Sequence, residues 1–430
     1  MTIPRQLHTS SAPAERPFEL WEDVPQERWD DWRWQLRNRI NGVEELGRVV
    51  ALSPEERAAL ATEGLFRVDV TPYLARLLAT ADPTSAIRRQ VIPTMRELEP
   101  FSGADPDSLA EEDFTTAPGI VHRYPDRVLM LVTTTCASYC RFCTRSRIVG
   151  KSEETFGRAD HELQLAYIAA NPSIRDVLLS GGDPLSLSDA VLERLLGGLR
   201  AIPHVEVVRI GTRVPFFLPQ RITDELLDVL RRHHPVWMNV HFNHPDELTP
   251  EVEAALARLA DAGVPLGSQA VLMAGINDCP NVMLALVRAL VRNRVRPYYI
   301  YQCDLVQGAG HFRTPVAKGI EIMEALRGHT SGFAVPTFVI DAPEGGGKVP
   351  IGPQYLLSMS EKRVVIRDFE GSISTYVQPD DYRSHDPSTC SYCEDAQTSG
   401  VAGLLQGDAA APERHERLER RSPLRRTRGQ

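Results

Sequence analysis

Short apolar runs alternate with helix-like segments through the middle of this 430-residue chain. The runs have the length of strands, and nearly every one precedes a segment with helical periodicity, at a spacing of roughly 30 residues. They are residues 128–132, 176–180, 205–210, 236–241, 268–272, 297–303 and 337–340. The predicted helices are residues 159–170, 188–200, 222–232, 249–263, 280–293 and 315–327. This alternation predicts a parallel sheet built from βα units.

Six or seven such units favour a barrel or partial barrel over a doubly wound open sheet. We therefore predict an α/β fold: a partial (βα)6-type TIM barrel with an N-terminal helical region and a C-terminal extension. In such barrels, reactive residues collect on the loops at the C-terminal ends of the strands. Those loops are the expected position of a functional site.

The remaining parts of the chain differ in composition. Residues 1–17 are rich in Ser, Thr, Pro and Ala without periodicity and are expected to be disordered. Residues 18–115 carry helical segments, and residues 116–345 hold the predicted barrel. Residues 346–410 contain strand-like runs and a pair of cysteines. The Arg-rich residues 411–430 lack a hydrophobic face and are expected to form a disordered, solvated tail.

The composition argues against several classes of protein. No apolar run approaches the roughly 20 residues that a membrane helix needs, and the N-terminus lacks the apolar core of a secretory signal. We therefore expect a cytoplasmic protein that acts away from membranes. A net charge of −9 argues against general nucleic-acid binding. The seven cysteines suit a reducing compartment better than a disulfide framework.

Three of these cysteines stand directly after the first apolar run. Cys136, Cys140 and Cys143 have the spacing C-x3-C-x2-C on the loop that leaves the strand. Three thiolates leave a tetrahedral zinc one ligand short, but they can hold three irons of a 4Fe-4S cluster and leave the fourth iron open. A zinc site completed from elsewhere, or three unrelated core cysteines, are the alternatives.

Two further groups of residues lie beside this strand. Gly181 and Gly182 follow the second predicted strand and precede Asp183; they form either an ordinary turn or a point where the backbone approaches a ligand closely. Arg123, Tyr124 and Arg127 precede the cysteine strand. Forked arginine donors could clamp a phosphate there, although surface charges before a strand are the simpler interpretation.

A Gly-rich run ends in Lys348. A phosphate-binding loop fails in detail, because Ala342 replaces its first glycine and Val349 replaces the required Ser or Thr. The other use of such a lysine is a Schiff base to pyridoxal phosphate; the alternative is an exposed lysine in a flexible loop. Asp304 and Asp341 end neighbouring strands, so two carboxylates could hold an ammonium or guanidinium, or simply cap turns.

The cysteine spacing resembles that of the radical S-adenosylmethionine enzymes, and longer stretches resemble one family among them, the lysine 2,3-aminomutases. The resemblance extends from about residue 18 to residue 406 without large gaps. The matching stretches are DDWRWQLRNRI, HRYPDRVL, DVLLSGGD, HFNHP, RVRPYYIY, HFRTPV, GIEIMEALRGHTSG and FVIDAP.

This resemblance implies three cofactors and a role for each candidate residue. The 4Fe-4S cluster would bind to Cys136, Cys140 and Cys143. S-adenosylmethionine would lie beside Thr144, Gly181, Gly182, Asp183 and Gln269. Pyridoxal phosphate would be carried on the catalytic Lys348, beside Arg123, Tyr124 and Arg127. The substrate would be held by Arg145 at its carboxylate and by Asp304 and Asp341 at its side-chain ammonium.

The implied reaction moves the 2-amino group of L-lysine to C3, giving β-lysine, after a 5′-deoxyadenosyl radical has taken a hydrogen from C3. Arginine 2,3-aminomutase is the close alternative, since a guanidinium also suits two carboxylates, whereas glutamate is disfavoured. An iron–sulfur electron carrier or binding protein is an alternative from another class. Val306, Gln307 and Glu344 depart from the family pattern near the substrate pocket, so the reaction type is better defined than the side chain accepted.

The resemblance also implies partners. These are an electron donor such as flavodoxin or ferredoxin, and further copies of the chain in a dimer or tetramer assembled through residues 346–410. In the family, a zinc ion at a subunit interface has four cysteine ligands. Here Cys279, Cys390 and Cys393 match three of them and Ser388 replaces the fourth, so zinc is either lost or completed by His385 or water.

Overall fold

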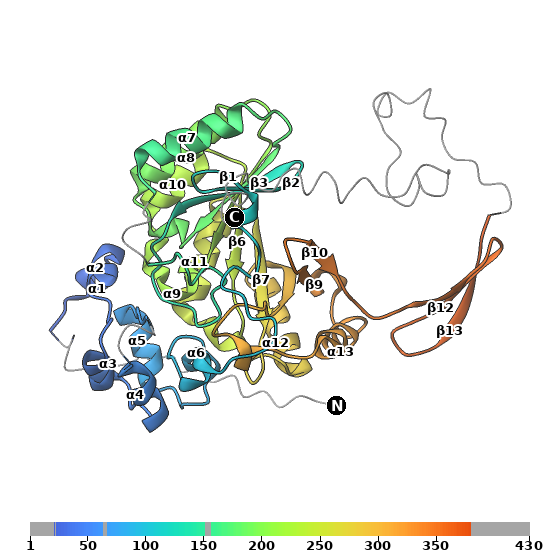
Figure 1. The fold of residues 1–430 in the computed structure, drawn as a ribbon, viewed down its shortest axis with the longest axis horizontal. Coiled ribbons are helices and arrows are strands. Elements are labelled where there is room, and N and C mark those ends of the chain that lie inside the picture. The colour runs from blue at the N-terminus through green and yellow to red at the C-terminus, as the bar shows by residue number, and fades with distance from the viewer. Residues whose placement is uncertain (1–20, 22, 63–66, 151–155, 380–430) are drawn as a thin grey trace, which may run out of the picture.

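The computed structural model describes residues 21, 23–62, 67–150 and 156–379 of the chain. Ten strands form one sheet in chain order from β1 to β10. Strands β3 to β9 are parallel, and antiparallel strands flank them at both edges. No pairing joins β1 to β10, so the described sheet is a partial barrel, which confirms the predicted fold class (Figure 1). The strands are β1 (Thr115–Ala117), β2 (Ile120–Tyr124), β3 (Arg127–Thr133), β4 (Asp176–Gly181), β5 (Val207–Thr212), β6 (Val236–His241), β7 (Leu266–Leu272), β8 (Arg296–Gln302), β9 (Thr337–Ala342) and β10 (Gly347–Pro350).

One helix follows each of the strands β3 to β8, as the alternation predicts. Their ends fall within one or two residues of the predicted positions, partly because capping residues fix them: Thr223 and Thr249 each accept a hydrogen bond from the backbone three residues on. These helices cover the outside of the sheet (Figure 1). They are α7 (Arg158–Ala169), α8 (Asp189–Arg200), α10 (Asp224–Arg232), α11 (Pro250–Asp261), α12 (Pro280–Arg292) and α13 (Val316–Leu326).

Burial alternates along the strands. In β4, Val177 and Leu179 are buried, while Leu178 and Ser180 stay partly accessible. In β7, Ser268 and Ala270 are buried and Gln269 between them is partly accessible. Successive side chains of a strand point to opposite faces, so one face packs against the helices and the other lines the interior of the partial barrel.

The N-terminal region is helical, as predicted, and lies beside the barrel (Figure 1). Trp29 and Trp32 are buried there, and the guanidinium of Arg221 stacks on the ring of Trp32 at 4.4 Å. The helices are α1 (Gln26–Trp29), α2 (Trp32–Arg37), α3 (Val43–Val49), α4 (Pro54–Leu60), α5 (Pro72–Ala79) and α6 (Ala86–Arg89). Shorter turns complete the body, namely α9 (Val214–Phe217) and the 3-10 helices η1 (Met95–Leu98), η2 (Glu112–Phe114), η4 (Pro184–Ser186), η5 (Pro219–Arg221), η6 (Pro245–Glu247), η7 (Gly310–Phe312) and η8 (Gly332–Ala334).

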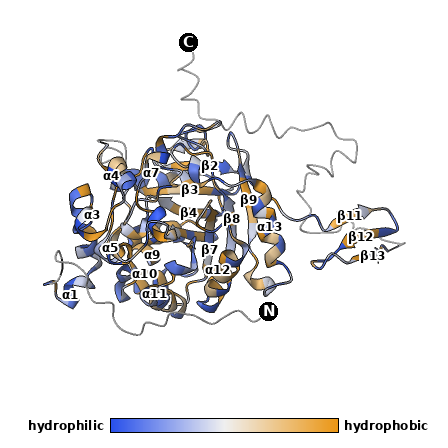
Figure 2. Ribbon diagram, turned by 90° about the horizontal axis from the view of Figure 1, so that it is seen from below, coloured by the Kyte–Doolittle hydropathy of each residue, from blue (hydrophilic) through white to orange (hydrophobic). Residues whose placement is uncertain are grey.

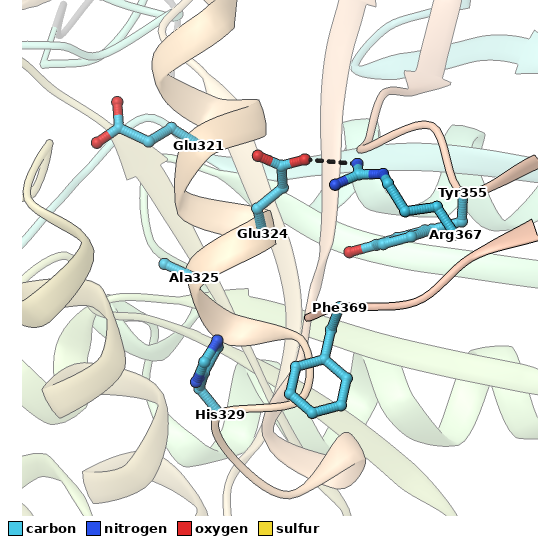
Figure 3. A pocket seen from close by; sticks show the side chains of 7 residues that line it. All are labelled: Glu321, Glu324, Ala325, His329, Tyr355, Arg367 and Phe369. Atoms are coloured by element: carbon cyan, nitrogen blue, oxygen red, sulfur yellow. Dashed lines mark hydrogen bonds and ion pairs between the residues drawn. The ribbon is translucent and has the colours of Figure 1, made fainter. Parts of the chain in front are cut away.

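A second, three-stranded antiparallel sheet follows the barrel. It consists of β11 (Leu356–Met359), β12 (Arg363–Arg367) and β13 (Ile373–Val377), and it projects from the body as an arm (Figures 1 and 2). At its base, a surface pocket lies between the arm and α13 (Figure 3). Arg367 there forms an ion pair with Glu324 at 2.9 Å. This ion pair and the rings of Tyr355 and Phe369 therefore join the arm to the barrel at this pocket.

Two local features differ from the sequence analysis. Lys348 lies in strand β10, paired with β9, and not in a flexible loop; the three preceding glycines turn the chain back onto β9. Arg123 and Tyr124 belong to β2, an added antiparallel strand that pairs with β3. Among the described residues, none of the helices combines the length and the apolar character that a membrane span requires.

The contact between α13 and β9 gives a test of this packing. A Cβ on Gly319 would lie 2.2 Å from the ring of Phe338, which is 1% exposed and cannot move aside. We expect Gly319→Ala to lower the free energy of unfolding by about 1–3 kcal/mol, measured by urea denaturation. Gly332→Ala is the matched control, since no atom lies within 4 Å of its Cβ position. Equal stability of the two variants would contradict this packing.

Candidate active site

The cysteine loop leaves the C-terminal end of β3 and is held against the loop that follows β4. The amide of Gly182 donates to the carbonyl of Thr133 at 2.7 Å, and that of Asp183 to the carbonyl of Thr135 at 2.8 Å. A Cβ at Gly181 or Gly182 would lie 2.2 or 2.3 Å from these same carbonyl oxygens. The two glycines are therefore required by the close approach of the two loops.

The three thiols lie on this loop, and each of the three cysteines is half-buried. Burial, and then the neighbouring thiols, raise the pKa of Cys136 and bring that of Cys143 to about 11. A guanidinium lies beside them, because Arg213 donates from Nη1 to the Sγ of Cys140 at 3.1 Å. Within the described residues, no three His, Cys, Asp or Glu side chains are placed so that together they could hold one metal ion. Clustered thiols on one loop fit a multi-iron cluster, whose positive charge would offset the repulsion between thiolates.

The Asp183 carboxylate, predicted to approach S-adenosylmethionine, is occupied by donors from the protein. It accepts hydrogen bonds from the Thr212 hydroxyl at 2.7 Å and from the amides of Arg213 and Leu185 at 2.7 and 3.0 Å. The amide of Val214 adds a fourth at 3.1 Å. In this structure Asp183 thus fixes the turn after β5 against the turn after β4.

The guanidinium of Arg145 forms a buried ion pair that sequence analysis did not find. Its Nε and Nη2 donate to the carboxylate of Glu111 at 2.6–3.1 Å, and its Nη1 donates to the Ser180 hydroxyl at 3.3 Å. Glu111 lies just before β1 and is only 3% exposed. Arg147 contacts the other side of the same carboxylate at 3.3 Å.

Lys348 and Asp341 face each other across the β9–β10 pair. The Nζ of Lys348 donates to both carboxylate oxygens of Asp341 at 3.0 Å and lies 5.1 Å from the centre of the Tyr301 ring. The backbone amide of Lys348 donates to the hydroxyl of Tyr124 at 3.1 Å. Tyr124 in turn carries the guanidinium of Arg127 over its ring at 4.0 Å.

Arg123 supplies a donor suited to an anion at this end of the site. It donates to the carbonyl of Leu109 and lies over the ring of Phe114 at 5.3 Å. Its Nε is buried without a hydrogen-bond partner among the described residues. A buried, unsatisfied guanidinium nitrogen fits a phosphate.

Asp304 follows β8 and lies close enough to Asp341 for the two charges to interact. Burial, and then the neighbouring charge of Asp341, raise the pKa of Asp304 to about 7. The site therefore holds two carboxylates and one lysine ammonium. A second cation placed between the carboxylates would lower this repulsion.

The remaining predicted residues are dispersed. Thr144 is part of the cysteine loop, and Gln269 lies on β7 level with His241 of β6. Cys279 is exposed at the start of α12. Cys390, Cys393, Ser388 and His385 lie outside the described residues, so the zinc site stays a prediction.

Several further residues of this site have no distinctive pattern in the sequence. Besides Glu111, Arg213 connects Cys140 to the buried Gln90 and Glu247, and His241 packs its ring against Phe142 at 5.6 Å. Burial, and then the charge of Arg213, lower the pKa of His241 to about 3, so it is neutral. Arg213 and His241 end or follow strands β5 and β6, so their position on barrel strands was the one signal available.

Comparisons with known proteins agree with this geometry. The family model described as Lysine-2,3-aminomutase matches residues 323–430, and that of the Radical SAM superfamily matches residues 130–287. L-lysine 2,3-aminomutase from Acetoanaerobium sticklandii is 51% identical over 93% of this chain and 98% of its own length. The enzyme of the same name from Clostridium subterminale is 52% identical, over 93% and 96%. Glutamate 2,3-aminomutase from Clostridioides difficile is 46% identical, over 81% and 82%.

The raised pKa of Asp304 predicts how stability depends on pH. Its pKa in the folded chain is about 7 against an ordinary value of 3.8, so the folded chain binds the proton more tightly than the unfolded chain does. The stability that this proton provides is lost as the pH rises from about 4 through 7, by about 1.4 kcal/mol for each pH unit. Asp304→Asn removes this contribution to the pH dependence of the free energy of unfolding.

The measurement is urea unfolding of the cofactor-free protein at several pH values between 5 and 8. We compare the free energy of unfolding of Asp304→Asn with that of the parent chain at each pH. This difference should shift in favour of the variant by roughly 1–4 kcal/mol between pH 5 and pH 8. A difference between the two proteins that stays constant with pH would contradict the interpretation.

Proposed function

Because the chain belongs to the lysine 2,3-aminomutase family of radical S-adenosylmethionine enzymes, we propose that it moves the 2-amino group of L-lysine to C3, giving β-lysine. The observation that carries the choice of substrate is the pair Asp304 and Asp341, two carboxylates whose charges interact, of which Asp341 forms an ion pair with Lys348. When bound, the cluster with S-adenosylmethionine supplies the radical that removes hydrogen, and pyridoxal phosphate holds the migrating nitrogen.

The residues of the chain hold these groups. Cys136, Cys140 and Cys143 would ligate the cluster, with Arg213 donating to one of the sulfurs. Lys348 would carry pyridoxal phosphate, with its phosphate at Arg123 and its ring near Tyr124 and Arg127. Thr144, the backbone of Gly181 and Gly182, and Gln269 would contact S-adenosylmethionine. Asp183 would act there through the turns that it fixes.

Lys348 and Asp341 make cofactor loading and substrate binding depend on each other. In the ligand-free chain, the Lys348 ammonium occupies both oxygens of Asp341. With pyridoxal phosphate bound, Lys348 would be held by the cofactor and would leave the Asp341 carboxylate without this counterion. Two carboxylates then lie close together in a largely buried site, and an ammonium at the end of a four-carbon side chain restores the balance of charge.

The same pair disfavours glutamate, whose side-chain carboxylate would be repelled. The rings of Tyr299 and Tyr301 lie 5.6 Å apart on β8, and Tyr301 lies beside the Lys348 ammonium; their low polarity strengthens the charge interactions at this end. Arg145 would bind the carboxylate of the amino acid. A one-electron donor such as flavodoxin or ferredoxin would reduce the cluster.

The test of this function is a comparison of substrates. We expect the reduced, fully loaded enzyme to convert L-lysine to β-lysine, detected by chromatography with mass detection, and to leave glutamate unchanged. Asp341→Asn should lower kcat/KM for lysine by roughly 100-fold or more, because it leaves the ammonium short of one charge. Conversion of arginine but not lysine would show that arginine is the substrate. Unchanged lysine turnover by Asp341→Asn would show that the carboxylate pair does not bind the substrate ammonium.

We also propose that the chain acts as a homo-oligomer through the β11–β13 arm. The register places Met359 and Tyr376 opposite Val364, and Leu356 opposite Ile366, on one face of this sheet. Met359 and Tyr376 are 67% and 63% exposed. This face is mainly apolar, with Ser374 as a polar member opposite Ile366, and such a face on a small projecting sheet is typical of an interface with a second copy.

Charges on that face test the interface. The double variant Met359→Glu with Tyr376→Glu should shift the protein to monomers in light scattering coupled to gel filtration, because two buried carboxylates would oppose association. Ser358→Glu with Thr375→Glu is the matched control, since these residues lie opposite each other on the other face of the arm through Val365. An unchanged mass of the first variant, or an equal change of both, would contradict the proposal.

A further inference from the structure

We propose that Glu111 is a positioning residue that holds one edge of the Arg145 guanidinium and so presents the other edge to the substrate carboxylate. This inference rests on the proposed function, in which Arg145 binds the carboxylate of an α-amino acid. It concerns a residue that lies outside the cysteine motif, the Gly-rich run and the paired aspartates. The geometry of a single ion pair carries it.

A count of hydrogen-bond donors shows which edge remains. A guanidinium has five N–H groups in one plane. Glu111 accepts from Nε and Nη2 of Arg145 at 2.6–3.1 Å, which occupies the Nε–Nη2 edge. Ser180 accepts from Nη1 at 3.3 Å. One N–H on Nη1 and one on Nη2 have no further acceptor among the described residues.

The Nη1–Nη2 edge, which points away from Nε, holds the free Nη2 N–H and one Nη1 N–H, whose only possible acceptor among the described residues is the Ser180 hydroxyl at 3.3 Å. Such a fork matches the two oxygens of a carboxylate. The Arg145 side chain is 18% exposed, so the rest of the protein does not enclose it completely. Ser180 comes directly before Gly181 at the end of β4 and lies on the interior face of the sheet. The free edge is thus available on the side where the loops after β3 and β4 meet.

Glu111 is better suited to remain on Arg145 than to leave when a substrate arrives. Its side chain is 4% exposed, so a displaced carboxylate would be buried with fewer partners, which is costly. Burial opposes its ionisation, but the charges of Arg145 and Arg147 outweigh burial and lower the pKa of Glu111. Glu111 is therefore an anion that requires both arginines.

Arg147 anchors the carboxylate from the other side. It contacts Glu111 at 3.3 Å and Asp107 at 2.9 Å. The segment before β1 and the cysteine loop are thereby joined through charged groups at several points. Fixed in this way, Arg145 cannot rotate about its long side chain, and the carboxylate of the substrate receives a pre-set direction.

The predicted consequence is selective for ligands that carry a carboxylate. Loss of the Glu111 charge frees Arg145 to rotate, so binding of an α-amino acid should weaken. Binding of the corresponding amine, which lacks the carboxylate, should not change. General damage to the site would weaken both, and a role of Glu111 as a competitor for Arg145 would have the opposite sign.

The experiment measures binding of L-lysine and of 1,5-diaminopentane, which is lysine without its carboxylate, to the oxidised, fully loaded enzyme by calorimetry. Without reductant no turnover occurs. We expect Glu111→Gln to weaken the binding of lysine roughly 10- to 100-fold and the binding of diaminopentane less than about 2-fold. In turnover, KM for lysine should rise by more than kcat falls.

A second glutamate–arginine pair provides the matched control, and its arginine, Arg141, lies four residues before Arg145 on the cysteine loop. Glu97 accepts from Nε and Nη2 of Arg141 at 2.8 and 2.5 Å, and this pair is also buried, with the Arg141 side chain 3% exposed and that of Glu97 7% exposed. Glu97→Gln should leave the ratio of the two affinities unchanged. If Glu111→Gln does not fold, Glu111→Asp keeps the charge but shortens the side chain, and should lower the ratio by a smaller factor.

Three results would overturn the inference: tighter lysine binding by Glu111→Gln, an equal loss for both ligands, or no change for either. A failure of the proposed function can be distinguished from a failure of this inference. If the parent enzyme acts on arginine instead of lysine, arginine and its decarboxylated amine replace the two ligands, and the same comparison still tests Glu111.

Discussion

Charged groups in the interior of this barrel must each have a partner, and that requirement governs the site. Burying an unpaired charge costs several kcal/mol. Arg145 is therefore paired with Glu111, Lys348 with Asp341, and Arg213 with Glu247 and the Cys140 thiol. Arg145 and Asp341, two of the groups proposed to hold the substrate, are thus already neutralised within the chain, whereas burial and the charge of Asp341 raise the pKa of Asp304.

The two ends of the proposed substrate site meet this requirement differently. Lys348 can give up its role as a counterion, because its nitrogen is the atom that would bond to pyridoxal phosphate. Glu111 has no such chemistry and stays where it is. The negative charge of Asp341 would therefore become available to the substrate ammonium when the cofactor is bound. The substrate carboxylate, in contrast, would bind to the unused edge of Arg145. The ligand has to bring a positive charge to one end and a planar anion to the other.

The fold was predictable because apolar periodicity and capping residues act locally. The runs around residues 128–132 and 236–241 form β3 and β6 as expected, and Thr223 and Thr249 begin their helices. Strand β10 was not predicted, since glycines and Lys348 have low strand propensity and pair only because β9 is adjacent. Glu111 was missed for a related reason: no local pattern distinguishes it from Glu112, and only the folded barrel brings it to Arg145.

A closed circuit of contacts explains why the cysteine loop can be rigid without regular secondary structure. The loop accepts the amide of Asp183 at Thr135. The Asp183 carboxylate accepts the amide of Arg213, and the side chain of Arg213 returns to Cys140. Each link joins the end of a different strand, from β3 to β4 to β5 and back. A cluster bound here would be held by a loop whose position is fixed by two neighbouring strands. The glycines at the end of β4 are needed because any side chain there would break the first link.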